Sequence, residues 1–133
     1  MFGIDTNVLV RLLVRDNDAQ VRAAERFIAT HCSAGDSGFV SRVVIAEVAW
    51  VLKDYYDYDR TQVAEAIRGL LNVSELELDA SDDVHAALRE FENSSAEFTD
   101  CLIARTNTSA GCAHTVTFDR RAAKLPGFKL LAG

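Results

Sequence analysis

The sequence predicts an α/β protein, a three-layer α/β/α sandwich whose central, mainly parallel sheet has about five strands. Two observations predict this class. Five short apolar runs alternate with longer segments of helical periodicity along the 133 residues. Strands that are separated by helices are joined by crossovers, so neighbouring strands run parallel and both faces of the sheet are covered. Ligands of such sheets gather beyond the carboxyl ends of the strands, and chemistry is expected there.

Each element has a local signal. The strands are short apolar or alternating runs, and the helices have apolar residues at three- and four-residue spacing. Most helices follow a residue type that caps helices. The expected strands are residues 2–4, 38–40, 74–78, 115–118 and 128–131. The expected helices begin at or after Asp5-Thr6-Asn7, Asp18, Ser41, Asp59 or Thr61, Ser81 and Glu97, and the last of them ends at Thr108.

Length and composition indicate one compact domain over residues 1–133. The chain is 49% hydrophobic and 26% charged, which supplies a core and excludes a disordered chain. No apolar run reaches the roughly 20 residues that cross a bilayer, and the first residues do not resemble a signal peptide. Cys32, Cys101 and Cys112 are odd in number and lack CxxC spacing. We therefore expect no disulfide framework and no zinc site, and a reducing cytoplasm fits the chain.

Charge is distributed unevenly along the chain. The formal net charge is −6, yet residues 1–100 carry −10 and residues 101–133 carry +4. An acidic protein is a poor general binder of nucleic acid, whereas a local basic sector is able to hold phosphates. A solvated basic face is the alternative interpretation.

Two aspartates follow expected strands. Asp5 comes after the first strand and Asp119 after the fourth, so both belong to the carboxyl edge of the predicted sheet. Taken singly, each is also explained as a helix cap.

Two further acids are isolated charges in apolar helical segments. Glu47 is the only charged residue between Val43 and Leu52, and Asp100 is the only one in residues 98–104. Such a carboxylate is expected to be partly buried, which requires a partner or a changed protonation state. A salt bridge with Arg42 or Arg105 is the structural alternative to a functional role.

Together the four acids predict a cation site. Four neighbouring carboxylates repel each other unless a divalent cation holds them. Oxygen ligands without Cys or His suit Mg²⁺ or Mn²⁺, and His31, His85 and His114 share no ligand spacing. Hydroxyl and amide groups near the acids are supporting polar candidates, with capping as the alternative: Thr6, Asn7 and Thr117.

The acids and their neighbours form four blocks along the chain. The blocks are Ile4–Leu9, Ser41–Leu52 with Glu47, Phe98–Ala104 with Asp100, and Thr117–Arg120 with Asp119. Their order and spacing resemble those of PIN-domain ribonucleases, and among these ribonucleases the chain looks most like VapC-type toxins, over essentially its whole length. One departure is Thr99, where relatives often have a small apolar residue.

The resemblance implies an endoribonuclease that depends on Mg²⁺ or Mn²⁺. Asp5, Asp100 and Asp119 match the main metal ligands and Glu47 the fourth acid, while Glu97 is an auxiliary acid or a first-turn carboxylate. Water activated by one or two cations would hydrolyse the RNA phosphodiester bond. Arg120 and Arg121 are candidates for holding the RNA backbone. The family also implies a homodimer and a complex with a cognate antitoxin protein.

Other functions stay open from sequence alone. An aspartate-dependent phosphatase would need a second Asp two residues after Asp5, where the chain has Asn7. A catalytically degenerate PIN-fold binding module is the non-enzyme alternative, although all four acids are present. The apolar residues of the first and third helices could serve an interface or the core: Val8, Leu9, Leu12, Leu13, Trp50 and Leu52.

Overall fold

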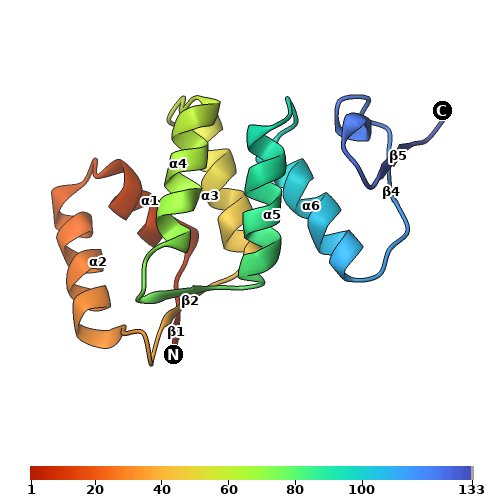
Figure 1. Cartoon of the computed structure of the whole chain (residues 1–133). Helices are drawn as coiled ribbons and strands as arrows, with labels where there is room; N and C mark the ends of the chain where they lie inside the picture. The colour runs from red at the N-terminus through yellow and green to blue at the C-terminus, as the bar shows by residue number, and fades with distance from the viewer. Residues whose placement is uncertain (133) are drawn as a thin grey trace. The chain divides into compact units, whose positions relative to one another are not determined.

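The computed structural model describes residues 1–132 (Figure 1), so Gly133, the last residue of the predicted domain, lies outside the described residues. Two compact units make up the chain: unit 1, Met1–Ser81, and unit 2, from Asp82 onward. Each unit combines helices with parallel strands, which confirms the predicted α/β class.

Unit 1 contains a three-stranded parallel sheet in the order β1-β2-β3. The central strand β2 pairs with both neighbours, and Phe39 lies between Gly3 and Glu77 in the register. Its Gly38 is closely packed, because a Cβ atom there would lie 3.0 Å from the Ile4 side chain, which would have to shift by a few tenths of an ångström. The elements are β1 Phe2–Gly3, α1 Thr6–Val14, α2 Asp18–His31, β2 Gly38–Val40, α3 Arg42–Asp54, α4 Arg60–Leu71 and β3 Leu76–Leu78.

Helix packing forms the core of unit 1. Helix α1 contacts α2 and α3, and α3 contacts α4, which runs alongside it in Figure 1. The apolar faces predicted from helical spacing supply the buried side chains. Leu9 and Leu52 belong to this core, whereas Trp50 is 62% exposed. The fully buried large residues of unit 1 are Leu9, Ile45, Leu52, Ile67, Val40 and Val48.

Unit 2 contains two helices and a two-stranded parallel sheet. The rings of Phe91 and Phe98, one from each helix, pack edge to face with their centroids 5.9 Å apart. Strands β4 and β5 pair with Thr117 opposite Leu130, and a short 3₁₀ helix that the sequence did not predict connects them. The elements are α5 Ser81–Glu92, α6 Phe98–Ser109, β4 Thr115–Thr117, η1 Ala122–Lys124 and β5 Phe128–Leu130.

The helix starts follow the predicted caps closely. The Ser41 hydroxyl accepts from the Val44 amide at 3.3 Å, and Asp59 forms a capping box with Gln62, which decides between Asp59 and Thr61. Helix α2 is capped by Asn17, one residue before the expected start. None of the helices within residues 1–132 has the length and apolar character needed to cross a bilayer.

The strands of the predicted sheet lie in two groups, one in each unit. The five expected strands are present and every pairing is parallel, yet they form sheets of three and two strands rather than one of five. Each strand has only two or three residues, so each offers few backbone groups for a ladder.

Candidate active site

Asp5 occupies the turn between β1 and α1. The Ile4 amide donates to the Phe39 carbonyl at 2.8 Å, which ties the end of β1 to β2. Asp5 then caps α1, and its Oδ1 accepts from the Thr6 amide at 2.8 Å. The predicted cap role is therefore confirmed, and it uses one carboxylate oxygen. The second oxygen, Oδ2, has no hydrogen-bond or ion-pair partner among residues 1–132.

Thr6 joins the start of α1 to the middle of α3. Its side chain is buried, and its hydroxyl donates to Oε1 of Glu47 at 3.0 Å. A neutral donor beside a carboxylate fixes the orientation of the carboxylate without neutralising its charge. Both residues line a pocket of about 380 Å³ together with Asp5 and Asn7. Unit 1 thus brings together two of the predicted acids and two of the predicted supporting residues.

Glu47 differs from the sequence expectation in one respect. It is exposed rather than partly buried, because α3 turns this position toward the open pocket while Ile45 and Val48 face the core. The structural alternative, a salt bridge with Arg42, is also wrong. The Arg42 Nε atom pairs with Asp79 at 3.0 Å, so this arginine does not neutralise Glu47.

Thr6→Val tests whether the hydroxyl orients Glu47. Valine has nearly the same shape, so the substitution removes the hydrogen bond and little else. We expect the RNA cleavage that the four sequence blocks imply to fall about tenfold, with a melting temperature within a few degrees of wild type, since one hydrogen bond contributes about 1 kcal/mol. Thr30→Val, at an exposed position of α2, is the control and should leave cleavage unchanged. Equal rates for the two variants would contradict this role.

In unit 2, Asp119 begins the turn after β4. Its Oδ1 accepts from the amides of Arg121 at 2.8 Å and Ala122 at 3.3 Å, so it caps the helical turn that leads into the 3₁₀ helix η1. The Thr117 hydroxyl accepts from the Asp119 amide at 3.0 Å and fixes the backbone at this point. As with Asp5, the predicted cap role is confirmed and Oδ2 has no partner within residues 1–132.

Asp100 lies in the first turn of α6 and is half-buried. Burial raises the pKa of its carboxyl above the ordinary value of 3.8, and the negative charges of Asp119 and Glu97 raise it further. The salt-bridge alternative is wrong here too, because Arg105 pairs with Asp83 at 3.7 Å. Unit 2 therefore holds neighbouring acids whose repulsion is not relieved by that arginine.

The basic residues after Asp119 differ in their partners. The Arg121 guanidinium lies 3.7 Å from Glu97, so part of its charge is balanced locally. Glu97 also precedes α6 as its N-cap residue without a side-chain cap bond. Arg120 is exposed, and its side chain has no hydrogen-bond or ion-pair partner among residues 1–132, which leaves its guanidinium available to a ligand.

The donor set in each unit suits a hard cation. In neither unit, over residues 1–132, do three Asp, Glu, His or Cys side chains converge tightly enough to hold a metal ion by themselves. Mg²⁺ usually keeps several waters and binds through one or two carboxylates plus substrate phosphates. The oriented carboxylates of Asp5 and Glu47, and the mutually repelling pair Asp100 and Asp119, have the oxygen chemistry that such binding requires.

Three residues with polar or charged groups at the unit 1 pocket were not predicted as site residues. Arg11, Tyr55 and Tyr56 line it beside the acids. A signal for Arg11 was present in the sequence, because it is the only charged residue of α1, just as Glu47 stands out in its own apolar segment. The tyrosines follow α3 and gave no comparable signal.

Comparison with known proteins agrees with the residues described above. Residues 3–127 match the PIN domain family. The chain belongs to the PIN domain family. A VapC ribonuclease from Aquifex aeolicus (strain VF5) is 28% identical over 126 residues, which covers 95% of this chain and 92% of that protein. The resemblance predicted from the four sequence blocks is confirmed.

Proposed function

We propose that this PIN-domain protein is a metal-dependent endoribonuclease that hydrolyses RNA phosphodiester bonds, and that it is the toxin of a toxin–antitoxin pair. The observation that carries the proposal is the pocket in which Thr6 orients Glu47 beside Asp5. Membership of the PIN family and similarity to a VapC ribonuclease support the activity. PIN nucleases generally depend on divalent metal ions.

The cation that fits the chain is Mg²⁺ or Mn²⁺. Asp5, Glu47, Asp100 and Asp119 would hold it, through their carboxylate oxygens and bridging waters. The unpartnered Oδ2 atoms of Asp5 and Asp119 support this assignment, and so does the mutual repulsion of the unit 2 acids, which a cation would relieve. A bound divalent cation lowers the pKa of water and neutralises the phosphate.

The chain's own residues orient the reacting groups. The Thr6 hydroxyl holds Glu47, and the backbone amides after Asp119 hold Oδ1 of that residue, so both carboxylates are fixed before substrate binds. The Thr117 hydroxyl accepts from the backbone amide of Asp119 and so fixes that residue. Asn7 adds a polar side chain to the unit 1 pocket. Arg120 and Arg121 would hold the RNA backbone against an otherwise acidic surface.

The proposed partners follow from the same reading. RNA is the substrate, a cognate antitoxin protein is the inhibitor, and the protein acts in the cytoplasm.

We also propose a homodimer, supported by an exposed apolar face of α3. Val43 and Trp50, seven residues apart on that helix, are 70% and 62% exposed. Sedimentation of the purified chain measures whether it is a monomer or a dimer in solution.

Metal removal tests the proposed function. We expect purified, antitoxin-free protein to cleave RNA with Mg²⁺ or Mn²⁺ and to stop in excess chelator, with activity restored when the metal is returned. Because the ion binds the folded state, Mn²⁺ at 100 times its Kd should stabilise the protein by about 2.7 kcal/mol, seen as a higher melting temperature. Cleavage that survives excess chelator, or a melting temperature that Mn²⁺ leaves unchanged, would overturn the metal mechanism.

A further inference from the structure

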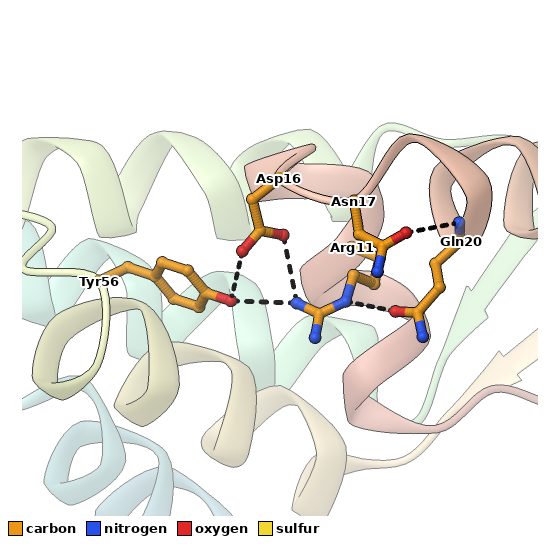
Figure 2. Close-up of polar contacts among 5 residues, drawn as sticks. All are labelled: Arg11, Asp16, Asn17, Gln20 and Tyr56. Carbon is orange, nitrogen blue, oxygen red and sulfur yellow. Dashed lines mark hydrogen bonds and ion pairs between the residues drawn. The ribbon is translucent and has the colours of Figure 1, made fainter.

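Arg11 is held in one orientation by three side chains (Figure 2). Its Nε atom donates to Gln20 on α2, and its Nη1 atom donates to Asp16 at 3.2 Å and to the Tyr56 hydroxyl at 3.0 Å. The Tyr56 hydroxyl in turn donates to the other Asp16 oxygen at 3.0 Å. Arg11, Asp16 and Tyr56 therefore form a closed ring of hydrogen bonds that fixes the plane of the guanidinium.

The backbone on both sides of this ring adopts conformations that most side chains avoid. Arg15 has φ 59° and ends α1, so that Asp16 turns back toward Arg11. Asp57 has φ 56° immediately after Tyr56. Left-handed backbone at residues other than glycine costs free energy and is concentrated at functional sites. Of these two residues, Arg15 directly precedes Asp16, and Asp57 directly follows Tyr56.

The third nitrogen of the guanidinium is not used by the ring. Nη2 of Arg11 has no hydrogen-bond or ion-pair partner among residues 1–132, and in Figure 2 it points away from the three partners. Among the described residues that line the pocket with Asp5 and Glu47, Arg11 is the only basic one. A fixed guanidinium with two free N–H groups is suited to a phosphate oxygen.

The rim of this pocket favours a nucleic acid over a phosphorylated protein. Tyr55 is 74% exposed there, and the centroid of its ring lies 5.0 Å from that of the Tyr56 ring. An exposed ring beside a fixed cation is what an unpaired base and its phosphate require, because bases stack on aromatic side chains.

We propose that Arg11 binds a backbone phosphate of single-stranded RNA beside Asp5 and Glu47, and that Tyr56 and Asp16 are positioning residues for Arg11. This inference rests on the proposed nuclease function and names part of its substrate site. Without Arg11, the two carboxylates of this pocket would repel the RNA backbone that they must approach.

RNA binding by non-cleaving protein tests the proposal. Asp119→Asn provides the background in which the RNA stays intact, and a fluorescent single-stranded RNA oligonucleotide of mixed sequence is titrated at several salt concentrations. We expect Arg11→Gln to weaken binding about tenfold and to lower the slope of log affinity against log salt by about one. Tyr56→Phe should weaken binding about threefold with an unchanged slope, because the charge remains. Arg26→Gln, at an exposed position of α2 that lines none of the described pockets, is the control.

The outcomes separate this proposal from the proposed function. If the Asp119→Asn background binds no RNA and wild type cleaves none, the nuclease function itself fails. If the background binds RNA and Arg11→Gln matches Arg26→Gln in affinity and slope, only the Arg11 site is overturned. If Arg11→Gln fails to fold, Arg11→Lys and Tyr56→Phe test the proposal in its place. Unchanged RNA binding by both variants would exclude a fixed phosphate contact at Arg11. Loss of antitoxin binding with unchanged RNA binding would assign Arg11 to a protein interface instead.

Discussion

We expect Asp100→Asn to lower RNA cleavage about a thousandfold and to raise the melting temperature of the metal-free protein. The loss of rate corresponds to about 4 kcal/mol of transition-state stabilisation, at 1.36 kcal/mol for each factor of ten. The gain in stability has a separate cause, because the substitution removes a half-buried negative charge that Asp119 and Glu97 repel. A conventional structural aspartate would show the opposite sign, with lower stability after its loss.

Asp82→Asn is the matched control for this variant. Asp82 is an exposed aspartate in the first turn of α5, as Asp100 is in the first turn of α6. Its carboxylate interacts favourably with the helix dipole, so we expect Asp82→Asn to destabilise the protein by a few tenths of a kcal/mol and to leave cleavage unchanged. If Asp100→Asn also lowers the melting temperature, the carboxylate of Asp100 has a structural role.

The stability gained by Asp100→Asn should depend on pH. The raised pKa means that folded protein binds a proton at Asp100 more readily than unfolded protein does. Below the ordinary value of 3.8 the carboxyl is protonated in both states, and wild type and variant should differ little. As the pH rises from 3.8 through the raised pKa, the charged carboxylate destabilises wild type, and the gap in melting temperature opens and then stays constant. Melting curves without metal across this range measure the gap, and a gap that narrows with rising pH would contradict the assignment.

Ile45→Ala should have the largest effect on stability without touching the site. Ile45 lies on α3, is 0% exposed, and packs in the core of unit 1 two residues before Glu47. Removing its side chain leaves a cavity, which costs about 3 kcal/mol and lowers the melting temperature by about 10 °C. Val43→Ala on the same helix is 70% exposed in the single chain and should change the stability of the monomer by less than about 0.5 kcal/mol. Thermal denaturation followed by circular dichroism compares the two, and equal melting temperatures would show that this face of α3 is not in the core.

Local patterns in the sequence predicted most elements but fewer contacts. Ser41 and Asp59 cap the helices that their residue types indicated, because a cap involves residues only three apart. Asp5 and Asp119 were predicted as caps for the same reason, since each follows a strand and precedes a helical turn. The expected burial of Glu47 was wrong, because an isolated charge in an apolar helix does not reveal which face of that helix meets the core.

Residue patterns predicted the α/β class, the parallel pairing of its strands and the four acidic blocks of a PIN-domain protein. These features depend on residue spacing within a single element or on the order of elements. The folded chain was needed to show that Thr6 holds Glu47, 41 residues away, and that Tyr56 holds Arg11, 45 residues away. The fold also shows that Arg42 and Arg105 pair with Asp79 and Asp83 rather than with the candidate acids. Such contacts depend on how helices rotate and pack against one another, and no local pattern in the chain encodes that rotation.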